Sequence, residues 1–531
     1  MKKKSLLASG LSLSFLTLLS RVLGLVREMT KAVFLGTSGY ADAFAIAFMI
    51  PNLFRRLFAE NSVSVAFIPT FRTYLEDADT EEGHRAAQEF VSASFTLVTF
   101  ATALVVSVGM LAAPLIVPLF YSGDRPDVLA ETALLTRIMF PYLLVISVAA
   151  FFQGMLNGVK VFSPSGFTPV LFNAIVIAAT YLLAPHLANP ARAMSVGVLA
   201  GGTAQALFQL PFVLRSGWRV GLAPLKAVLS NAGTKKVLLL IVPTVVGMAA
   251  YQLNDVVSTA LAGRSGTGIV SSLQYSLRLQ ELILGVFVVS ISTVILPDLA
   301  ALAKKEQWQS FCGMLGQAVR IIALITVPVS VYAYLCGTEI ISLVYKGRSF
   351  DDESVRLTLQ AFRWHIAGLF FIAANRIVSQ AFYAMGNTKF PALAGILSFA
   401  VNILLALLLA SPMQGGGIAL ALSAASAANT ALLAIFLRRT KRIDVGGIVK
   451  DTVLYVTKLA AMSAIAALPV IFLLPRLNAL VAGCGRIARY GVPLALTAMA
   501  FGAAGAALLA LTRDPFIAMI RDKIARRTSR Q

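Results

Sequence analysis

The feature that most constrains this chain is a series of apolar runs, each about 20 residues or longer, that recurs from end to end. An α-helix needs about 20 apolar residues to cross a hydrocarbon core of ~30 Å. Only 13% of the residues are charged and 58% are hydrophobic, whereas about a quarter of the residues in soluble domains are charged. The chain is therefore predicted to be an all-α polytopic membrane protein.

Glycine, proline and charged clusters divide these runs into about fourteen predicted transmembrane helices. The predicted spans are 9–36, 41–74, 88–120, 129–157, 164–185, 194–214, 235–262, 269–300, 311–337, 356–385, 390–411, 415–437, 450–474 and 487–512. The predicted domains are an N-terminal lobe at 1–214 (helices 1–6), a cytoplasmic linker at 215–234, a C-terminal lobe at 235–437 (helices 7–12), helices 13–14 at 438–512, and a basic cytoplasmic tail at 513–531.

A faint internal repeat favours the division into two six-helix lobes. Asp42 to Pro69 and Val270 to Pro297 have the same length, and each carries arginine and glutamate in mid-span. Six helices return the chain to its starting side of the membrane, so the lobes are expected to be parallel repeats. Substrate sites in such folds lie at the interface between the repeats.

The net charge of +21 has a distribution typical of membrane topology rather than of nucleic-acid binding. Lysine and arginine gather in alternate connections, chiefly 215–236 and 438–450, which the positive-inside rule places in the cytoplasm. Both termini are then cytoplasmic and the protein lies in the bacterial inner membrane; arginines at 476–489 weaken this count for the last pair of helices. The first helix lacks an A-x-A-like cleavage site and is expected to stay uncleaved.

Charged residues inside the apolar spans are the candidates for function. Each arginine at a helix centre costs roughly 2.5–3.5 kcal/mol on insertion scales, so such residues usually face a water-filled cavity. They are Arg21 and Arg27 in the first span, Asp42, Arg55, Arg56 and Glu60 in the second, and Arg278 and Glu281 in the eighth. Because the planar guanidinium donates paired hydrogen bonds and stays charged, this set predicts a binding site for a phosphate or diphosphate.

Structural interpretations compete with this functional one. Arg56 and Glu60 (i,i+4) and Arg278 and Glu281 (i,i+3) have the spacing of intrahelical ion pairs, and the first pair is predicted to be structural. Asp42 begins a helix, where its charge would suit the helix dipole.

The sequence leaves open the directions of Arg21 and Arg27 and the role of two intramembrane polar residues. Arg21 and Arg27 lie ~240° apart on a straight helix, so both reach one point only if the helix bends at Gly24; otherwise they extend toward the interface. Asp255 and Asn402 are intramembrane polar residues that suit either a cation site or interhelical hydrogen bonds.

Other kinds of site have little support. Three widely spaced cysteines and three scattered histidines indicate no disulfide framework, zinc site or histidine-based catalytic centre. No cluster of paired carboxylates or nucleophiles suits a membrane glycosyltransferase or phosphatase. The chain is therefore predicted to be a transporter rather than an enzyme, with no cofactor.

Several motifs resemble the MurJ/MviN family of lipid II flippases, within the multidrug/oligosaccharidyl-lipid/polysaccharide exporter superfamily. Ser20 to Glu28 resembles the family's S-R-x-x-G-x-x-R-[DE] signature. The stretches 41–44, 50–60, 275–281, 295–297 and 382–391 resemble further family elements.

The resemblance implies fourteen helices, two six-helix lobes around a cationic central cavity, and a groove for the lipid tail at helices 13 and 14. It implies transport of undecaprenyl-diphosphate-linked lipid II from the inner to the outer leaflet by alternating access, for cell-wall biosynthesis. Arg21, Arg27, Asp42, Arg55 and Arg278 match positions that the family needs for activity, and Glu281 matches an acidic cavity position. Lipid II, membrane lipids and other cell-wall synthesis proteins are the expected partners.

This sequence also departs from the family pattern. Asn61 stands where the family usually has glycine, and Leu277 replaces an acidic residue. The seventh-helix acid of sodium-binding members falls at Ser258 rather than at Asp255, so Na⁺, H⁺ and the membrane potential all stay open as the driving force. A flippase for another lipid-linked oligosaccharide and a cation-coupled multidrug exporter remain the alternative functions.

Overall fold

The computed structural model describes residues 6–60, 66–121, 125–440 and 442–516, with the backbone alone at 6–14, 58–60, 242–251, 286–290 and 293. Helices are the only regular secondary structure in these residues, which confirms the all-α prediction. Eight described helical segments are long and apolar enough to cross a membrane, or nine if the bent pair α14 (Asp352–Ala367) and α15 (Leu369–Ala384) is one span. The total of fourteen and the central cavity stay predictions.

The chain packs as two compact units, Met1–Ser271 with Gly347–Phe350, and Ser272–Lys346 with Asp351–Gln531. The predicted seventh span packs with the first unit, although the repeat assigns it to the C-terminal lobe. The predicted lobes rest on the sequence repeat, whereas the two units rest on packing. The packing therefore does not test the predicted lobe boundaries.

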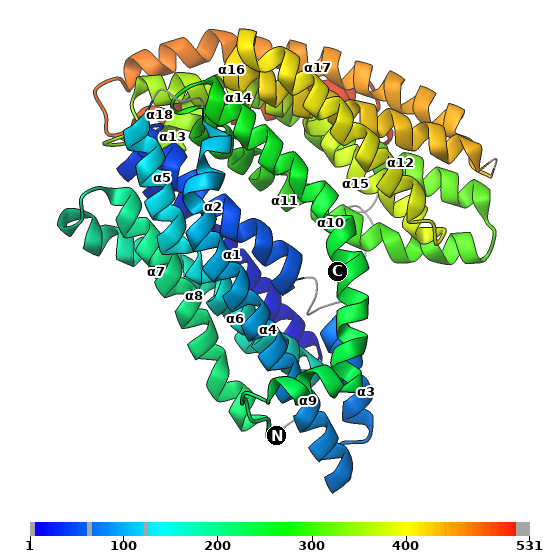
Figure 1. Cartoon of the computed structure of the whole chain (residues 1–531). Coiled ribbons are helices and arrows are strands. Elements are labelled where there is room, and N and C mark those ends of the chain that lie inside the picture. Colours follow the sequence, from blue (N-terminus) through cyan, green and yellow to red (C-terminus); the bar gives the residue numbers. More distant parts are fainter. Residues whose placement is uncertain (1–5, 61–65, 122–124, 441, 517–531) are drawn as a thin grey trace. The chain divides into compact units, whose positions relative to one another are not determined.

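The first unit is built mainly from long helices that pack side by side along their lengths. Its elements are α1 (Leu6–Leu35), α2 (Gly39–Phe54), η1 (Arg55–Glu60), α3 (Ile68–Glu76), α4 (Glu81–Ile116), η3 (Val117–Phe120), α5 (Pro126–Met139), α6 (Pro141–Gly158), α7 (Ser163–Leu183), η4 (Ala184–His186), α8 (Pro190–Arg215), α9 (Leu225–Ser230) and α10 (Ala232–Ser265). Helices α7 and α8 lie side by side, and α7 also packs along α1 (Figure 1). The buried aromatic side chains of Phe67, Phe71, Phe90 and Phe151 form one centre of its core.

The second unit holds α12 (Trp308–Leu335), α13 (Gly337–Tyr345), α14, α15, α16 (Lys389–Arg439), α17 (Val445–Leu480) and α18 (Arg486–Leu511), together with α11 (Ile269–Lys304) from Ser272 onward. Helix α17 packs along α12, and α18 packs on α17 and α13 (Figure 1). The long helix α16 contains a backbone break at Gln414, with φ 47° and ψ −128°. This break falls in the predicted connection between the spans 390–411 and 415–437.

Two predicted spans are interrupted in ways that the apolar pattern did not indicate. Span 41–74 leaves α-geometry after Phe54 and continues as the π-helix η1 before α3 begins at Ile68. Pro51, inside the last turn of α2, lacks an N–H and crowds the preceding turn. The wider π-turn that follows carries Arg55 and Arg56, and such turns often occur at functional sites.

The predicted span 356–385 is bent by 43° between α14 and α15. A Cβ at Gly368 would lie 2.5 Å from the Cβ of Ser423, so only glycine allows this close approach. The Ser423 hydroxyl donates to the Trp364 carbonyl at 2.7 Å, and the Ser330 hydroxyl donates to the Ile366 carbonyl at 3.0 Å. These hydroxyls add hydrogen bonds to carbonyls at the bend, both of which also accept the Gly368 backbone N–H.

Candidate functional site

Helix α1 carries the first two candidate arginines, and it continues without interruption through Gly24. The Arg21 side chain is exposed, and it has no hydrogen bond or ion pair with another residue that the structure describes. The Arg27 guanidinium is largely buried, donates to Glu28 at 2.8 Å, and lies 5.8 Å from the centroid of the Phe172 ring. The two arginines thus occupy different environments, as their angular separation on one helix predicts.

Two more charged residues on α1 extend this cluster. The Lys31 ammonium lies 3.3 Å from the second carboxylate oxygen of Glu28, and its side chain is 4% exposed. One carboxylate is therefore shared by Arg27 and Lys31, which leaves an excess of positive charge. The sequence analysis did not select Lys31, although its spacing of three from Glu28 and four from Arg27 places all three on one face.

Helix α7 supports this part of α1. Phe172 presents its ring to Arg27, and the next residue, Asn173, donates its amide N–H to the Ser20 carbonyl at 3.3 Å. Both side chains are buried. Phe172 and Asn173 therefore hold two parts of α1 against α7: the residue before Arg21 and the face that carries Arg27.

Asp42 begins α2, but its side chain acts on a different helix. It is 2% exposed, and its carboxylate accepts hydrogen bonds from the backbone N–H of Gly268 at 2.6 Å and of Ser271 at 2.8 Å. These groups belong to the start of α11, whose first N–H groups have no partner within the helix. Asp42 therefore caps the N-terminus of α11, while Ser38 caps α2 itself.

Two arginines fasten the same connection between α10 and α11 to other parts of the first unit. The Arg264 guanidinium donates to the Leu119 carbonyl at 3.0 Å, and Arg125 donates to the Thr267 hydroxyl at 2.7 Å. We name residues 264–271, with these bonds and those of Asp42, the α10–α11 clamp. Sequence reasoning missed both arginines because they lie outside the predicted spans, Arg125 just before α5 and Arg264 in the last turn of α10, where positive charge indicates only membrane topology.

The arginines of η1 differ in their contacts. The Arg55 Nε donates to the Asn52 side chain at 2.8 Å. The Arg56 guanidinium lies 3.3 Å from both the Asp255 carboxylate and the Gln252 side-chain oxygen on α10. The Glu60 side chain lies outside the described residues, so the predicted pair of Arg56 with Glu60 stays a prediction.

The residues of the predicted cation site have other surroundings. Asp255 pairs with Arg56, and Ser258 lies one turn further along α10 in the first unit. Asn402 is buried in α16 of the second unit. The described part of the chain holds no group of three histidine, cysteine, aspartate or glutamate side chains arranged for a metal ion.

In the second unit, Arg278 and Glu281 form the i,i+3 ion pair that their spacing predicts, at 2.8 Å. Their side chains are 35% and 59% exposed, so the pair is accessible. The buried neighbours on α11 bond to α14: the Ser276 hydroxyl lies 2.6 Å from the His365 ring nitrogen, and the Gln280 amide bonds the His365 carbonyl. These contacts fix the helix that carries Arg278.

The candidate residues thus form one charged group on α1 and another on η1 in the first unit, and an ion pair on α11 in the second. Guanidinium groups with exposed donors bind anions, above all phosphate oxygens. No described arrangement here resembles a nucleophile with its general base. The geometry suits recognition of an anionic group rather than catalysis.

Comparison with known proteins places these features in a family context. The family model described as lipid II flippase MurJ matches residues 31–479. The chain is 48% identical to a probable lipid II flippase MurJ from Treponema pallidum over 97% of both chains, and 34% identical to a lipid II flippase MurJ from Burkholderia cenocepacia over 81% of this chain and 83% of the relative.

Solved structures share the fold. A lipid II flippase MurJ in an inward closed conformation superposes with a TM-score of 0.75 at 23% identity, over 94% of this chain and 98% of that one. An inward-facing multidrug resistance MATE family transporter of the MOP superfamily gives a TM-score of 0.64 at 14% identity, over 81% of this chain and 96% of the other. At these identities the likeness concerns the fold alone.

Proposed function

Because this chain belongs to the lipid II flippase MurJ family, we propose that it moves lipid II from the inner to the outer leaflet of the bacterial cytoplasmic membrane for cell-wall biosynthesis. The observation that carries the proposal is 48% identity to a probable lipid II flippase over 97% of both chains. The MATE transporters share only the fold, so they do not favour drug export. Association with other cell-wall synthesis proteins stays a prediction.

The head group is proposed to bind through its diphosphate. Arg21 supports this step because its guanidinium is exposed and unengaged among the described residues, and Arg27 with Lys31 adds positive charge that Glu28 only partly offsets. Arg55 and Arg278 are proposed as further ligands because they match the family's functional positions. Guanidinium pairs suit a diphosphate because its oxygens accept parallel hydrogen bonds.

The α10–α11 clamp is proposed to close one side of the transport path during head-group binding. Four hydrogen bonds hold the connection between α10 and α11 to Asp42, Arg125 and the Leu119 carbonyl. Alternating access requires such contacts to break when the path opens on that side. With the N-terminus proposed to be cytoplasmic, the clamp lies at the outer face, and Glu281 is proposed to exchange partners during the cycle. The lipid tail is proposed to follow the faces of α17 and α18.

A complementation experiment tests the proposal. The chain is expressed in a strain depleted of its own lipid II flippase, and lipid II is measured separately in each leaflet. The wild type is expected to restore outward movement, whereas Arg21→Ala and Arg278→Ala are expected to accumulate in the membrane and fail. Arg356→Ala is the matched control, because Arg356 pairs with Glu353 on an exposed helix face. Normal movement in both test variants would overturn the proposed role of the arginines.

The membrane potential is proposed as the driving force. Asp255, the acidic candidate for a cation site, is engaged by Arg56 at 3.3 Å, and it lies one turn from the position that sodium-binding members use. Replacement of Na⁺ by K⁺ at constant potential is expected to leave transport in vesicles unchanged, whereas collapse of the potential is expected to stop it. Loss of transport on removal of Na⁺ alone would identify a sodium-coupled mechanism instead.

A further inference from the structure

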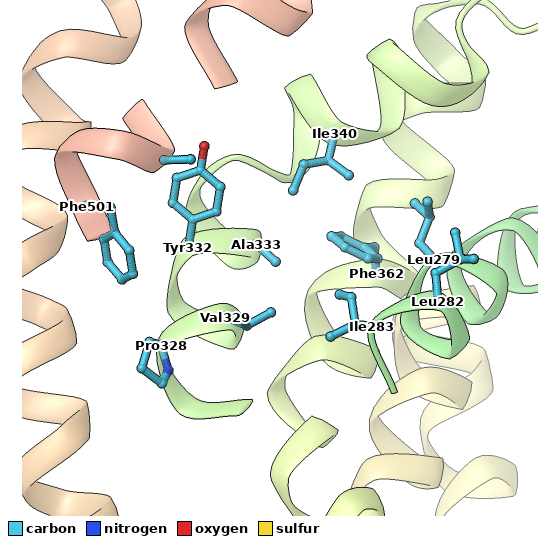
Figure 2. Close-up of a pocket in the computed structure, with 11 residues that line it drawn as sticks. Leu279, Leu282, Ile283, Pro328, Val329, Tyr332, Ala333, Ile340, Phe362 and Phe501 are labelled. Atoms are coloured by element: carbon cyan, nitrogen blue, oxygen red, sulfur yellow. The ribbon is translucent and has the colours of Figure 1, made fainter. Parts of the chain in front are cut away.

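The second unit contains an apolar cavity that the candidate arginines do not use. Its volume is about 350 Å³. Eleven residues of α11, α12, α13, α14 and α18 line it: Leu279, Leu282, Ile283, Pro328, Val329, Tyr332, Ala333, Ile340, Phe362, Ala498 and Phe501. Figure 2 shows Pro328, Val329, Tyr332 and Phe501 on one side, and Leu279, Leu282, Ile283 and Phe362 opposite them.

The one side-chain polar atom in this lining is already engaged. The Tyr332 hydroxyl donates to the Leu494 carbonyl at 2.7 Å and lies 3.0 Å from the Thr497 hydroxyl of α18. The cavity therefore offers no unpaired side-chain polar group to a ligand or to water. A cavity of this kind stays dry and takes apolar molecules.

Size and position indicate the class of occupant. An apolar cavity of about 150 Å³ accommodates benzene, so this cavity accommodates roughly a dozen carbon atoms. It is only partly enclosed and is bounded by α12 and α18, both of which are apolar enough to cross a membrane. The bilayer surrounds such helices with hydrocarbon chains.

We propose that this cavity binds one acyl chain of a bilayer phospholipid, inserted between α18 and the α11–α12 pair. A polyprenyl tail is far longer and branched, and most of it would remain outside a space of this size. The side chains that line an empty apolar space lack dispersion contacts on that side. An inserted acyl chain supplies these contacts to α11, α12 and α18.

Photolabelling of the full-length protein tests the proposal. The protein is reconstituted in vesicles that contain a phosphatidylcholine with a diazirine in mid-chain, irradiated, and mapped by peptide mass spectrometry. Label is expected on Ile283 and Val329, which line opposite sides of the cavity and are partly accessible. The Ala498→Phe variant then separates label inside the cavity from label by bulk lipid. Absence of label on both residues would overturn the proposal.

Two variants on α18 sharpen the test. Ala498→Phe fills the cavity and is expected to reduce the label on Ile283 and Val329 at least fivefold. Ala503→Phe adds the same ring to an exposed position on another face of α18 and is expected to leave the label unchanged. If Ala498→Phe does not accumulate, absence of label on both residues of the wild type still overturns the proposal.

A second arm separates the two sources of hydrocarbon. The same vesicles are prepared with an undecaprenyl diphosphate that carries a diazirine in its chain. Label on Ile283 and Val329 from this probe, with none from the phospholipid probe, would reassign the cavity to the cargo tail and overturn the acyl-chain proposal. Neither result depends on the transport reaction, so failure here leaves the proposed flippase function to its own test.

Discussion

Replacement of Asp42 by asparagine is expected to release the α10–α11 clamp while the overall fold is retained. The Asp42 carboxylate is buried and accepts two backbone N–H groups at the start of α11. An asparagine side chain has one acceptor oxygen, so its NH₂ group would face the second N–H donor. The substitution therefore removes one charge-assisted hydrogen bond and leaves one backbone N–H unpaired.

The magnitude follows from these two losses. A hydrogen bond to a charged group contributes about 2 kcal/mol, and an unsatisfied buried N–H costs at least about 1 kcal/mol. The clamped state is then destabilised by about 3 kcal/mol, or roughly a hundredfold in its equilibrium with an open state. The helix dipole of α11 adds to this loss, because a negative charge leaves its N-terminus.

Thiol accessibility measures the change. Val270 is 2% exposed and lies within the clamp, so Val270→Cys reacts with a maleimide only when the clamp opens. The reporter is built in a Cys484→Ser background, because Cys484 is exposed. If the clamped state predominates in the wild type, the labelling rate follows the open population, and Asp42→Asn is expected to raise it by one to two orders of magnitude.

A matched control separates the clamp from a general loss of stability. Ser38→Ala removes the N-cap of α2, whose side chain accepts the Ala41 N–H, and costs about 1 kcal/mol, but it leaves the bonds of Asp42 to α11 in place. It is expected to leave the labelling of Val270→Cys within about threefold of the wild-type rate. A rate in Asp42→Asn that matches this control would refute the argument that Asp42 holds α11.

Two further predictions concern the first unit. Arg192→Ala removes the paired hydrogen bonds of 2.8 and 2.7 Å to Glu131, whose side chain is 8% exposed. It is expected to lower the free energy of unfolding by about 2 kcal/mol, a value discounted for the partial exposure of the arginine. An unchanged thermal midpoint would contradict this prediction. Gly36→Ala places a Cβ 1.9 Å from the Ser349 carbonyl oxygen at φ 57°, so little folded protein is expected by fluorescence-detected chromatography. Gly217→Ala is the control, because Gly217 has φ 87° and open space around it, so its substitution introduces backbone strain without a clash. This variant is expected to fold, and equal yields of the two variants would refute the argument that the clash at Gly36 prevents folding.

The apolar periodicity predicted most helices because the bilayer imposes it directly. A span needs a minimum length and few charges whatever its neighbours are, so the ranges 164–185 and 194–214 fall on α7 and α8 without any knowledge of packing. The interruptions at Arg55–Glu60 and Gly368 were missed. They depend on the backbone geometry that the chain adopts after α2 and on how closely Ser423 approaches Gly368, and neither effect changes hydropathy.

The candidate site also contains features that the sequence predicts and features that depend on packing. Arginines inside apolar spans are costly wherever the helices end up, so Arg21, Arg27, Arg55 and Arg278 could be selected from residue type and position alone. Of their partners, the sequence analysis selected only Glu281, which lies within one helix turn of Arg278. Glu28 beside Arg27 and Asn52 three residues before Arg55 are just as local, but their spacing was not used.

The intramembrane arginines and the apolar runs are therefore what the sequence by itself determined about this protein, because both follow from the free energy of transfer into hydrocarbon, which each segment meets alone. Only the tertiary structure decided that Asp42 caps α11 rather than serving α2, and that Arg56 meets Asp255. These contacts join residues about 200 or more positions apart in the chain. No local pattern encodes them, since the geometry of packing alone brings a donor within 3 Å or so of its acceptor.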